Sequence, residues 1–484
     1  MILAIDQGTT GTTCVVFDEA CSVLGCAYRE IEQHYPRPGW VEHDPDEIWQ
    51  SVLAAGGAAL REAGVEARQL QAIGITNQRE TVVAWDRQSG RPLHRAIVWQ
   101  DRRTAARCDE LRERGYEPFV RERTGLLLDP YFSGTKLEWL YGEGGVPQSA
   151  AVGTVDSWLT FRLTGEHVTD PSNASRTLLY DLRRRAWDDD LCALFSVPAD
   201  SLPRVAPTSG VVGETSAFGS AVPVCAIVGD QQAALFGQRC IDSSTAKCTY
   251  GTGNFVLRAT GVAEPAPARG LVTTVAWEIG DRFEYALEAS VFVTGAAVQW
   301  LRDGLGIIQT ADETEALAAS LESNDGVYFV PALTGLGSPY WDPYARGTIV
   351  GLTRGAGRAH VARAALEAIA YQTADALRAQ DGVVSETLVE LRADGGATAN
   401  GWLMQFQADV LGVPVAVAPY AETTALGVAY LAGIGAGCWT ERDVDGFARE
   451  PRRYEPRPDG GDGLRRLADW RRAVECARNW AATL

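Results

Sequence analysis

Short apolar runs bounded by polar, glycine-rich stretches recur along the chain and predict buried β-strands. The first run is Ile2–Ile5, and a second run, Cys14–Phe17, follows the polar stretch Asp6–Thr13. Two short strands joined by a glycine- and threonine-rich turn are typical of a β-hairpin. Further apolar runs predict strands at Gln71–Thr76, Thr81–Trp85, Val222–Val228 and Pro414–Ala418.

A second hairpin of the same kind is predicted near the middle of the chain. The run Ala246–Thr249 precedes the turn Tyr250–Asn254, and the run Phe255–Leu257 follows it. Thr9 and Thr252 occupy matching places in the two turns, and nearly half of the 484 residues lie between them. Because one such hairpin opens each half, the sequence predicts a duplicated domain.

Between the strands, apolar residues recur at intervals typical of helices. In residues 359–380 they form one face, and Asn400–Leu411 shows a second apolar stripe. Strands that alternate with helices in this way predict an α/β fold with mixed sheets. Residues 261–270 and 451–464 are rich in proline and glycine and predict loops, the second of which leads into a closing helix. The face of the first helix comprises Val361, Ala365, Ile369, Thr373 and Leu377.

The composition narrows the classes of function. Hydrophobic residues make up 46% and charged residues 22%, as in an ordinary globular protein. The formal net charge of −18 argues against nucleic acid or an anionic membrane as the main partner. The N-terminus carries no basic leader, and no run approaches the roughly 18 apolar residues of a spanning helix. We therefore expect a cytoplasmic protein without membrane insertion.

The reactive side chains are sparse. Ten cysteines include no Cys-x-x-Cys pair, and the five histidines do not lie at metal-ligand spacing beside them. This pattern favours buried thiols in a reducing compartment. Lys136 and Lys247 are the only lysines, and every other basic residue is arginine.

The two predicted hairpin turns are candidate phosphate-binding loops. In residues 6–13, glycines let the backbone approach a phosphate closely, and Thr9 and Thr10 can donate to its oxygens. Asp6 could hold a hydrated Mg²⁺, since that ion takes carboxylate and water ligands. Taken alone, each turn is equally consistent with a structural hairpin. The second turn, Gly251-Thr252-Gly253, favours the functional interpretation because two loops can clamp a polyphosphate from both sides.

Three charged or glycine-rich segments are further candidates. Asp230 follows an apolar strand, and either a helix N-cap or a general base kept ionised by the helix terminus would explain it. Gln78-Arg79-Glu80 is either a solvated loop or a polyol site, where Arg donates and Glu accepts hydrogen bonds. Trp99 and Phe255 could cover the C–H face of a small polyol. The segment 394–400 ends a strand and opens a helix, whose N-terminus suits anions.

Several long motifs together resemble the FGGY carbohydrate kinases of the actin/hexokinase superfamily, and within them the kinases that act on glycerol. The similarity runs from about residue 2 to about residue 440, with the motifs in order. The residues that carry it are Asp6–Thr10, Gly74–Thr81, Asp129–Lys136, Gly229–Gln238 and Gly335–Gly347.

The resemblance implies two ribonuclease-H-like domains flanking a deep cleft. Residues 1–238 would hold the polyol site, the first phosphate loop and the catalytic aspartate, and residues 239–484 the nucleotide site. The implied reaction is ATP-dependent phosphorylation of glycerol to sn-glycerol 3-phosphate, the first step of glycerol catabolism. Glycerol and ATP would be the substrates, Mg²⁺ the metal, and a homo-oligomer of two or four copies the assembly.

The resemblance also implies residue roles. Asp230 would be the general base, and Asp6 and Asp230 would place Mg²⁺, through water. The polyol site would comprise Arg79, Glu80, Tyr131, Asp230, Gln231, Trp99 and Phe255. The nucleotide site would comprise Thr9, Thr10, Gly11, Gly251, Thr252, Gly295, Gln299, Gly396, Ala397 and Asn400.

This chain also departs from the family pattern. The first loop of the family usually continues Ser-Ser-Arg, but here it reads Gly11-Thr12-Thr13, so an arginine near the phosphates is missing. Gly401 stands where a second Asn often follows Asn400. Relatives inhibited by fructose 1,6-bisphosphate carry a glycine-rich, basic loop before the Gly229–Gln238 motif, and some relatives carry a phosphorylated histidine. Here the loop, residues 216–223, is short and contains neither a basic residue nor a histidine. We therefore expect no inhibition by fructose 1,6-bisphosphate and no phosphohistidine control.

Two other functions remain to be separated from this one. Another kinase of the same family could act on xylulose, gluconate or erythritol. A nucleotide-switched binding or filament protein of the actin type would need neither Asp230 nor the polyol residues.

Overall fold

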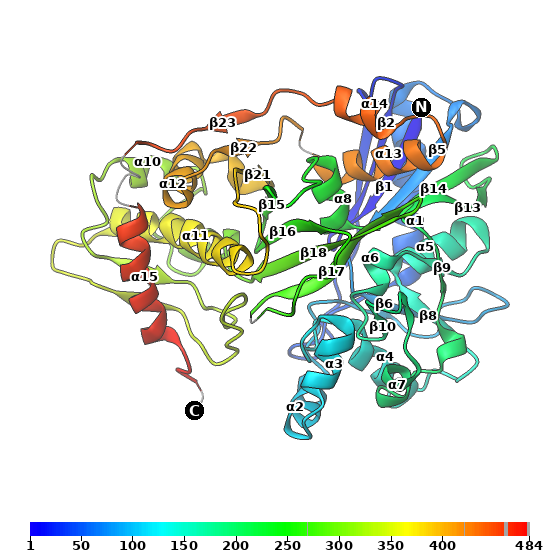
Figure 1. Ribbon diagram of the computed structural model, residues 1–484, viewed down its shortest axis with the longest axis horizontal. Helices are drawn as coiled ribbons and strands as arrows, with labels where there is room; N and C mark the ends of the chain where they lie inside the picture. The colour runs from blue at the N-terminus through cyan, green and yellow to red at the C-terminus, as the bar shows by residue number, and fades with distance from the viewer. Residues whose placement is uncertain (269, 421, 459–462, 482–484) are drawn as a thin grey trace.

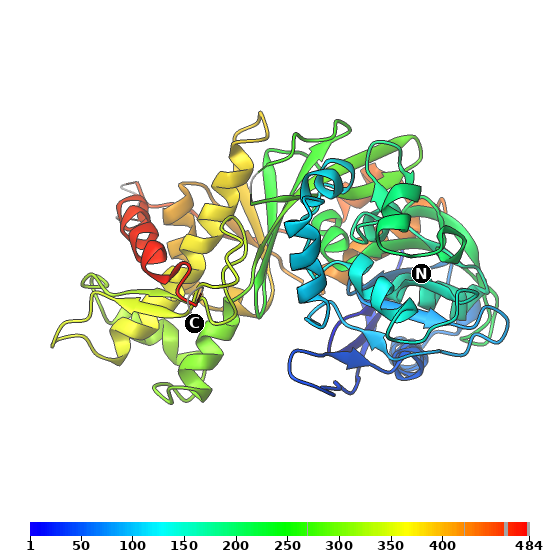
Figure 2. The same ribbon diagram turned by 90° about the horizontal axis from the view of Figure 1, so that it is seen from below.

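The computed structural model describes residues 1–268, 270–420, 422–458 and 463–481. Within these ranges, thirteen strands form one continuous mixed sheet that runs through the molecule, with helices packed on its faces (Figure 1). Seen from below, the first half of the chain and most of the second half form two lobes (Figure 2).

The sheet contains the same five-strand arrangement twice. In the first half the order is β3-β2-β1-β5-β14, with the first three strands antiparallel and the last three parallel. In the second half the order β18-β16-β15-β21-β22 has the same pattern of directions. This is the strand order of a ribonuclease-H-like domain, so the predicted duplication and both predicted hairpins are confirmed. The strands are β1 (Ile2–Gln7), β2 (Gly11–Phe17), β3 (Val23–Glu30), β5 (Ala72–Asn77), β14 (Val222–Gly229), β15 (Thr245–Tyr250), β16 (Asn254–Gly261), β18 (Arg282–Val291), β21 (Glu390–Asp394) and β22 (Val415–Val417).

The apolar run at the N-terminus is continuous because both faces of β1 are covered. Leu3 and Ile5 pack into a core with α1 (Pro45–Ala63) and α5 (Val155–Thr164), whereas Ile2 and Ala4 pack with α13 (Thr423–Gly435). Successive side chains of a strand point to opposite faces, so β1 contributes side chains to two separate hydrophobic cores. The remaining strands of the large sheet are β13 (Ser209–Thr215), β17 (Val272–Ile279) and β23 (Arg452–Tyr454), the last within a stretch predicted to be a loop.

The second half has its own core around α11 (Arg358–Asp381). Ala365, Ile369 and Leu377 of the predicted apolar face are buried there, beside Cys248 and Tyr250 of β15. Other helices of this half are α9 (Gly295–Asp303), α10 (Glu313–Ala319), α12 (Gly401–Leu411) and α15 (Gly463–Ala477).

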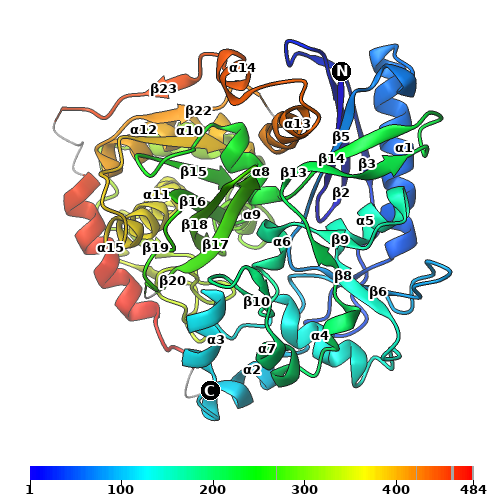
Figure 3. The ribbon, with the colours of Figure 1, turned by 45° about the vertical axis from the view of Figure 1, so that its right-hand side comes forward.

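Helix α13 comes from the second half of the chain but packs against β1, β5 and β14 of the first half (Figure 3). It crosses α8 (Asp230–Gly237) at very short range, because a Cβ atom at Gly427 would overlap the carbonyl oxygen of Ala233, and one at Gly237 would overlap that of Thr423. Glycine is therefore required where the two helices touch. The domain limits 1–238 and 239–484 stay a prediction.

None of the helices in the described ranges combines the length and apolar character needed to cross a bilayer.

Smaller elements surround these two units. The remaining helices are α2 (Ala105–Glu113), α3 (Glu117–Thr124), α4 (Ser133–Tyr141), α6 (Pro171–Ala174), α7 (Asp189–Leu194) and α14 (Glu441–Gly446). The short strands are β4 (Glu42–His43), β6 (Val82–Trp85), β7 (Ala96–Ile97), β8 (Ala151–Thr154), β9 (Val168–Thr169), β10 (Tyr180–Asp181), β11 (Ala186–Trp187), β12 (Arg204–Val205), β19 (Tyr328–Val330) and β20 (Thr348–Val350).

Candidate active site

The two candidate catalytic carboxylates lie at the same edge of the sheet. Strands β1, β5 and β14 are parallel neighbours, with Asp6 opposite Thr76 and Asn77 opposite Gly229. The carboxyl ends of parallel strands are where an open α/β sheet gathers its functional groups. Asp6, near the end of β1, and Asp230, directly after β14, therefore approach each other closely enough to interact electrostatically.

Asp230 is the first residue of α8, and Gly229 is its N-cap. Of the two interpretations of Asp230, the helix N-cap is therefore excluded. Burial raises the pKa of Asp230, and the opposing effects of Arg79, Lys247 and the backbone N–H of Gln231 do not cancel that rise. Desolvation is thus a larger effect on the pKa of Asp230 than its place at a helix N-terminus. A raised pKa makes the carboxylate a better proton acceptor.

The first phosphate loop is held by three side chains. The indole Nε1 of Trp99 donates to Thr9 Oγ1 at 2.9 Å, Gln33 Nε2 donates to Thr9 O at 2.9 Å, and the Tyr28 hydroxyl donates to Thr10 O at 3.0 Å. Since Trp99 occupies the acceptor side of the Thr9 hydroxyl, the hydroxyl proton of Thr9 is free to donate to a phosphate oxygen.

The departure at Gly11 has a local reason. A Cβ atom at this position would overlap the Tyr28 ring and the carbonyl oxygen of Arg29. Thr13 pairs with Asp6 on one side and with Tyr28 on the other, so the three side chains share one face of the sheet. In this chain the phenol of Tyr28 therefore packs over the first loop.

The second phosphate loop is joined to the start of a helix. Gly251 N–H donates to Gly253 O at 3.0 Å and closes the turn. Gly295 N–H, at the start of α9, donates to Gly251 O at 3.1 Å, and a side chain at Gly295 would overlap that oxygen. Ala296 N–H also donates to Thr252 O, at 3.1 Å, so the N-terminus of α9 is fixed against the loop.

The predicted polyol residues form one contiguous group. The ring of Trp99 meets Tyr131 and Phe255 edge to face, with centroid distances of 5.6 and 6.3 Å. Arg79 Nη2 donates to the Tyr131 hydroxyl at 3.4 Å, and Arg79 Nε lies 3.3 Å from Asp230 Oδ1. Aromatic rings and polar groups thus adjoin in this group, and Gln231 follows Asp230 directly in α8.

Gln78, Arg79 and Glu80 are all buried, which excludes the solvated-loop interpretation. Glu80 has a φ of 62°, an unusual backbone conformation for a residue other than glycine. Such strain persists where the surroundings hold it, and Ser133 Oγ donates to Glu80 O at 3.1 Å. Burial raises the pKa of Glu80 despite the opposing charges of Arg79 and Arg176.

Two residues of this group were missed from the sequence. Glu288 of β18 accepts from Arg79 Nη1 at 2.6 Å and from Arg176 Nη2 at 2.9 Å. Arg176 Nε also donates to Glu80 Oε1 at 2.6 Å. These four buried charges balance each other. Arg176 follows α6 and Glu288 lies on a central strand, and no local motif singled out either position.

Asp6 fits a metal role. Burial raises the pKa of Asp6 well above its ordinary range, and the charges of Asp230 and Glu422 raise it further. Within the described chain no side chain donates a hydrogen bond to Asp6. A hydrated Mg²⁺ fits this place, since it needs only one or two carboxylates besides water and phosphate. No group of three or more His, Cys, Asp or Glu side chains in the described ranges would enclose a metal completely.

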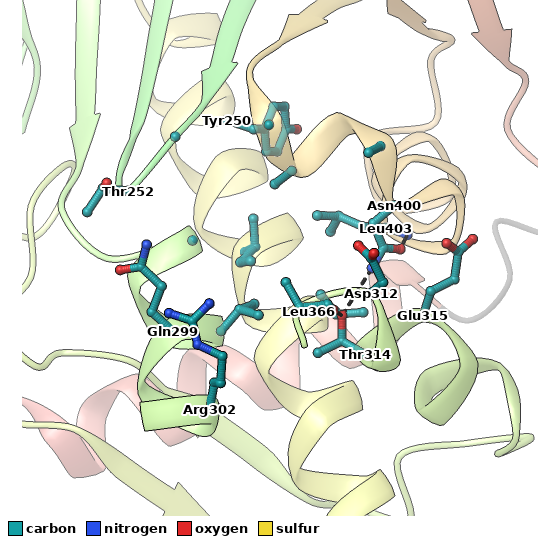
Figure 4. A pocket seen from close by; sticks show the side chains of 18 residues that line it. Tyr250, Thr252, Gln299, Arg302, Asp312, Thr314, Glu315, Leu366, Asn400 and Leu403 are labelled. Atoms are coloured by element: carbon teal, nitrogen blue, oxygen red, sulfur yellow. Dashed lines mark hydrogen bonds between the residues drawn. The ribbon is translucent and has the colours of Figure 1, made fainter. Parts of the chain in front are cut away.

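Most of the predicted nucleotide residues line one cavity of about 550 Å³ in the second half (Figure 4). Asn400 caps α12, accepting from Leu403 N–H at 2.9 Å, and its Nδ2 donates to Thr314 Oγ1 at 3.3 Å. Lining residues absent from the prediction include Arg302, Asp312 and Glu315, which no motif marked. Of the predicted residues, Gly251, Thr252, Gly295, Gln299, Gly396, Ala397 and Asn400 line this cavity, whereas Thr9, Thr10 and Gly11 belong to the first loop.

Comparisons with known proteins agree with this architecture. The sequence model of the FGGY family of carbohydrate kinases matches residues 1–237 with its N-terminal domain and residues 246–436 with its C-terminal domain. Glycerol kinase of Dechloromonas aromatica is 55% identical over 99% of this chain and 98% of its own, and glycerol kinase of Trichlorobacter lovleyi is 53% identical over 99% of both. The crystal structure of Plasmodium falciparum glycerol kinase with ADP superposes with a TM-score of 0.91 at 34% identity, covering 98% of each chain.

Proposed function

The chain belongs to the FGGY family of carbohydrate kinases, and from this premise we propose that it transfers the γ-phosphoryl group of ATP to glycerol. The products are sn-glycerol 3-phosphate and ADP. Full-length similarity to curated glycerol kinases supports this function, as does the ADP-bound relative. The observation that carries the proposal is the contiguous group of Arg79, Tyr131, Trp99 and Asp230 beside the first phosphate loop.

In this function the polyol residues bind and orient the acceptor. The aromatic rings cover its C–H face, while Arg79 and Glu80 hydrogen-bond to its hydroxyls. Asp230 takes the proton of the attacking hydroxyl. Because phosphoryl transfer through a loose transition state depends mainly on position and electrostatics, the fixed geometry of these groups is the main catalytic contribution.

The phosphates of ATP are bound by both loops. Thr9 and Thr10 donate to them from the first half, and the Gly251–Gly253 turn binds them from the second half. Asp6 and Asp230 would hold Mg²⁺ through water, and the ion would neutralise phosphate charge. The adenosine part lies in the 550 Å³ cavity that Asn400 helps to line. We also propose that the protein is cytoplasmic and forms a homo-oligomer.

The product tests this function. Incubation with ATP, Mg²⁺ and glycerol should give a phosphate ester that an NAD-dependent sn-glycerol-3-phosphate dehydrogenase oxidises. Absence of that ester, with phosphorylation of a pentulose instead, would favour the related sugar kinases. ATP hydrolysis that is indifferent to polyols would favour an actin-like binding protein.

A further inference from the structure

The two lysines of this chain are both completely buried, but their surroundings differ. Lys136 Nζ donates to three backbone carbonyl oxygens, those of Pro130, Tyr131 and Phe132, at 2.7–3.0 Å. That arrangement ties a loop to a helix and needs no further explanation. Lys247 Nζ instead donates to one side chain, Gln231 Oε1, at 2.5 Å.

Lys247 lies between the general base and the second phosphate loop. It belongs to β15, which ends at Tyr250, directly before Gly251. Its cross-strand partner is Leu257, and Thr249, two residues further along β15, is paired with Phe255 of the polyol site. Lys247 and Thr249 therefore point to the same face of the sheet, the face on which α8 begins.

The charges around Lys247 are mainly negative. Burial lowers the pKa of Lys247, and the negative charges of Asp394 and Asp230 oppose that effect without cancelling it. Asp394 Oδ2 accepts from Gln238 Nε2 at 2.8 Å, but Asp394 Oδ1 is buried without a hydrogen-bond partner in the described chain. The nearby guanidinium of Arg79 is already bound to Glu288.

A purely structural role explains this placement poorly. A buried ammonium group is costly unless it is fully paired, and an apolar side chain of similar size would usually stabilise the fold as well or better. Lys247 has one side-chain acceptor, although an ammonium group can make three hydrogen bonds. Its position beside Gln231 and Asp230 therefore points to a role at the reaction centre.

The direction of the hydrogen bond fixes the orientation of Gln231. A lysine can only donate, so the carboxamide must turn its oxygen toward Lys247. The Nε2 amide group then points away from the lysine, and the Gln231 side chain is partly exposed, so this donor can reach a ligand.

We propose that Lys247 is a positioning residue for phosphoryl transfer: it holds Gln231, the residue next to Asp230, as a hydrogen-bond donor to the acceptor hydroxyl. This inference rests on the proposed function, in which Gln231 belongs to the polyol site. It assigns Gln231 a donor role and makes that role dependent on a buried cation from the other half of the chain.

The test measures steady-state kinetics and ADP binding for Lys247→Met, Gln231→Leu and the double variant. A hydrogen bond to a charged group contributes about 1.5–3 kcal/mol, so kcat/KM for glycerol should fall about 10- to 150-fold in each single variant. ADP affinity should stay within about twofold. Because the two residues act together, kcat/KM of the double variant should be at most about threefold lower than kcat/KM of the less active single variant. Losses that multiply, or Lys247→Met with kcat/KM within twofold of wild type, would overturn the inference.

Arg258 provides the matched control. It is a completely buried cation on the neighbouring strand, one residue from Leu257, so its side chain points to the opposite face, where it pairs with Asp381 at 2.6 Å. Arg258→Met should lower the melting temperature and leave the kcat/KM of the folded enzyme unchanged. If Arg258→Met reduced kcat/KM as strongly as Lys247→Met, the effect of Lys247 would be structural and the inference would be overturned.

Gln231→Glu tests the inference even if Lys247→Met fails to fold. The new carboxylate can pair with Lys247, which preserves folding, but it cannot donate, so glycerol affinity should fall at least about tenfold. Unchanged glycerol affinity in this variant would overturn the donor role. Failure of the wild type to use glycerol at all would instead overturn the proposed function.

Discussion

Both carboxylate oxygens of Glu288 accept hydrogen bonds from the guanidinium group of Arg79, Oε2 from Nη1 at 2.6 Å and Oε1 from Nη2 at 3.1 Å. Glu288 belongs to β18 of the second half, whereas Arg79 follows β5 of the first half, so the pair joins the two halves at the proposed polyol site. Burial alone would raise the pKa of Glu288, but Arg176 and Arg79 outweigh it and lower the pKa to about 2.

Glu288→Gln should therefore weaken both the fold and glycerol binding. Removing one partner from a buried ion pair costs about 3–5 kcal/mol, and Arg79 would lose its fixed orientation. We expect a lower free energy of unfolding in urea and a glycerol KM raised at least about tenfold, with the KM for ATP less affected. An unchanged glycerol KM would contradict this role.

The same residue gives a pH dependence. The folded-state pKa of Glu288 lies below its ordinary value of 4.5, so its contribution is complete above pH 4.5 and is lost as the pH falls toward 2. The stability difference between wild type and Glu288→Gln should therefore narrow by up to about 3 kcal/mol over that range. Urea unfolding at a series of pH values measures it, and a constant difference would contradict the assignment.

Trp99→Phe should separate the two roles of Trp99. Phenylalanine keeps an aromatic wall against Tyr131 and Phe255 but removes the donor to Thr9. Loss of one hydrogen bond, about 0.5–1.5 kcal/mol, should raise the KM for ATP about 2- to 10-fold, more than the KM for glycerol. Trp139→Phe is the control, since its indole donates only to Glu143, at 3.0 Å. An ATP KM equal to that of wild type would rule out the link to the first loop.

Gly427→Ala should destabilise the protein strongly. The added methyl group would overlap Ala233 O. Because that oxygen belongs to the backbone of α8, it cannot move aside as the end of a flexible side chain could. We expect a loss of at least about 2 kcal/mol, visible as a lower melting temperature. Gly446→Ala, where nothing lies within 4 Å of the new methyl group, should change stability by less than about 0.5 kcal/mol. Equal melting temperatures for the two variants would contradict the close crossing.

Fructose 1,6-bisphosphate should leave the activity unchanged at constant free Mg²⁺. The segment between β13 and β14 contains no basic side chain, and its Phe218 packs against Gly56 of α1, where a Cβ would overlap the Phe218 ring. A bisphosphate would find no cation there to bind. A clear, saturable loss of activity would contradict this expectation.

Local patterns in the sequence were sufficient for much of the fold. The apolar run Ile2–Ile5 and the segment Ala246–Thr249, each followed by a turn of glycine and threonine and a second strand, predicted the two hairpins. The packing of α13 on the first half could not be predicted, since its hydrophobic pattern does not say which sheet it covers.

The candidate site was predictable where motifs were long. Arg79, Glu80 and Asp230 came from such motifs, and the structure brings them together with Tyr131. Glu288 was not predictable, because its partners are distant in the chain and a lone glutamate in a strand carries no local signal. The raised pKa of Asp230 also required the structure, since burial depends on the whole fold.

The central claim is that this chain phosphorylates glycerol with Asp230 as the base. ADP release measured against glycerol, xylulose, gluconate, erythritol and no acceptor, for wild type and Asp230→Asn, tests it most directly. We predict release that depends on glycerol, and a kcat about 10²- to 10⁴-fold lower in Asp230→Asn. Preference for xylulose, release without any acceptor, or full activity of Asp230→Asn would contradict it.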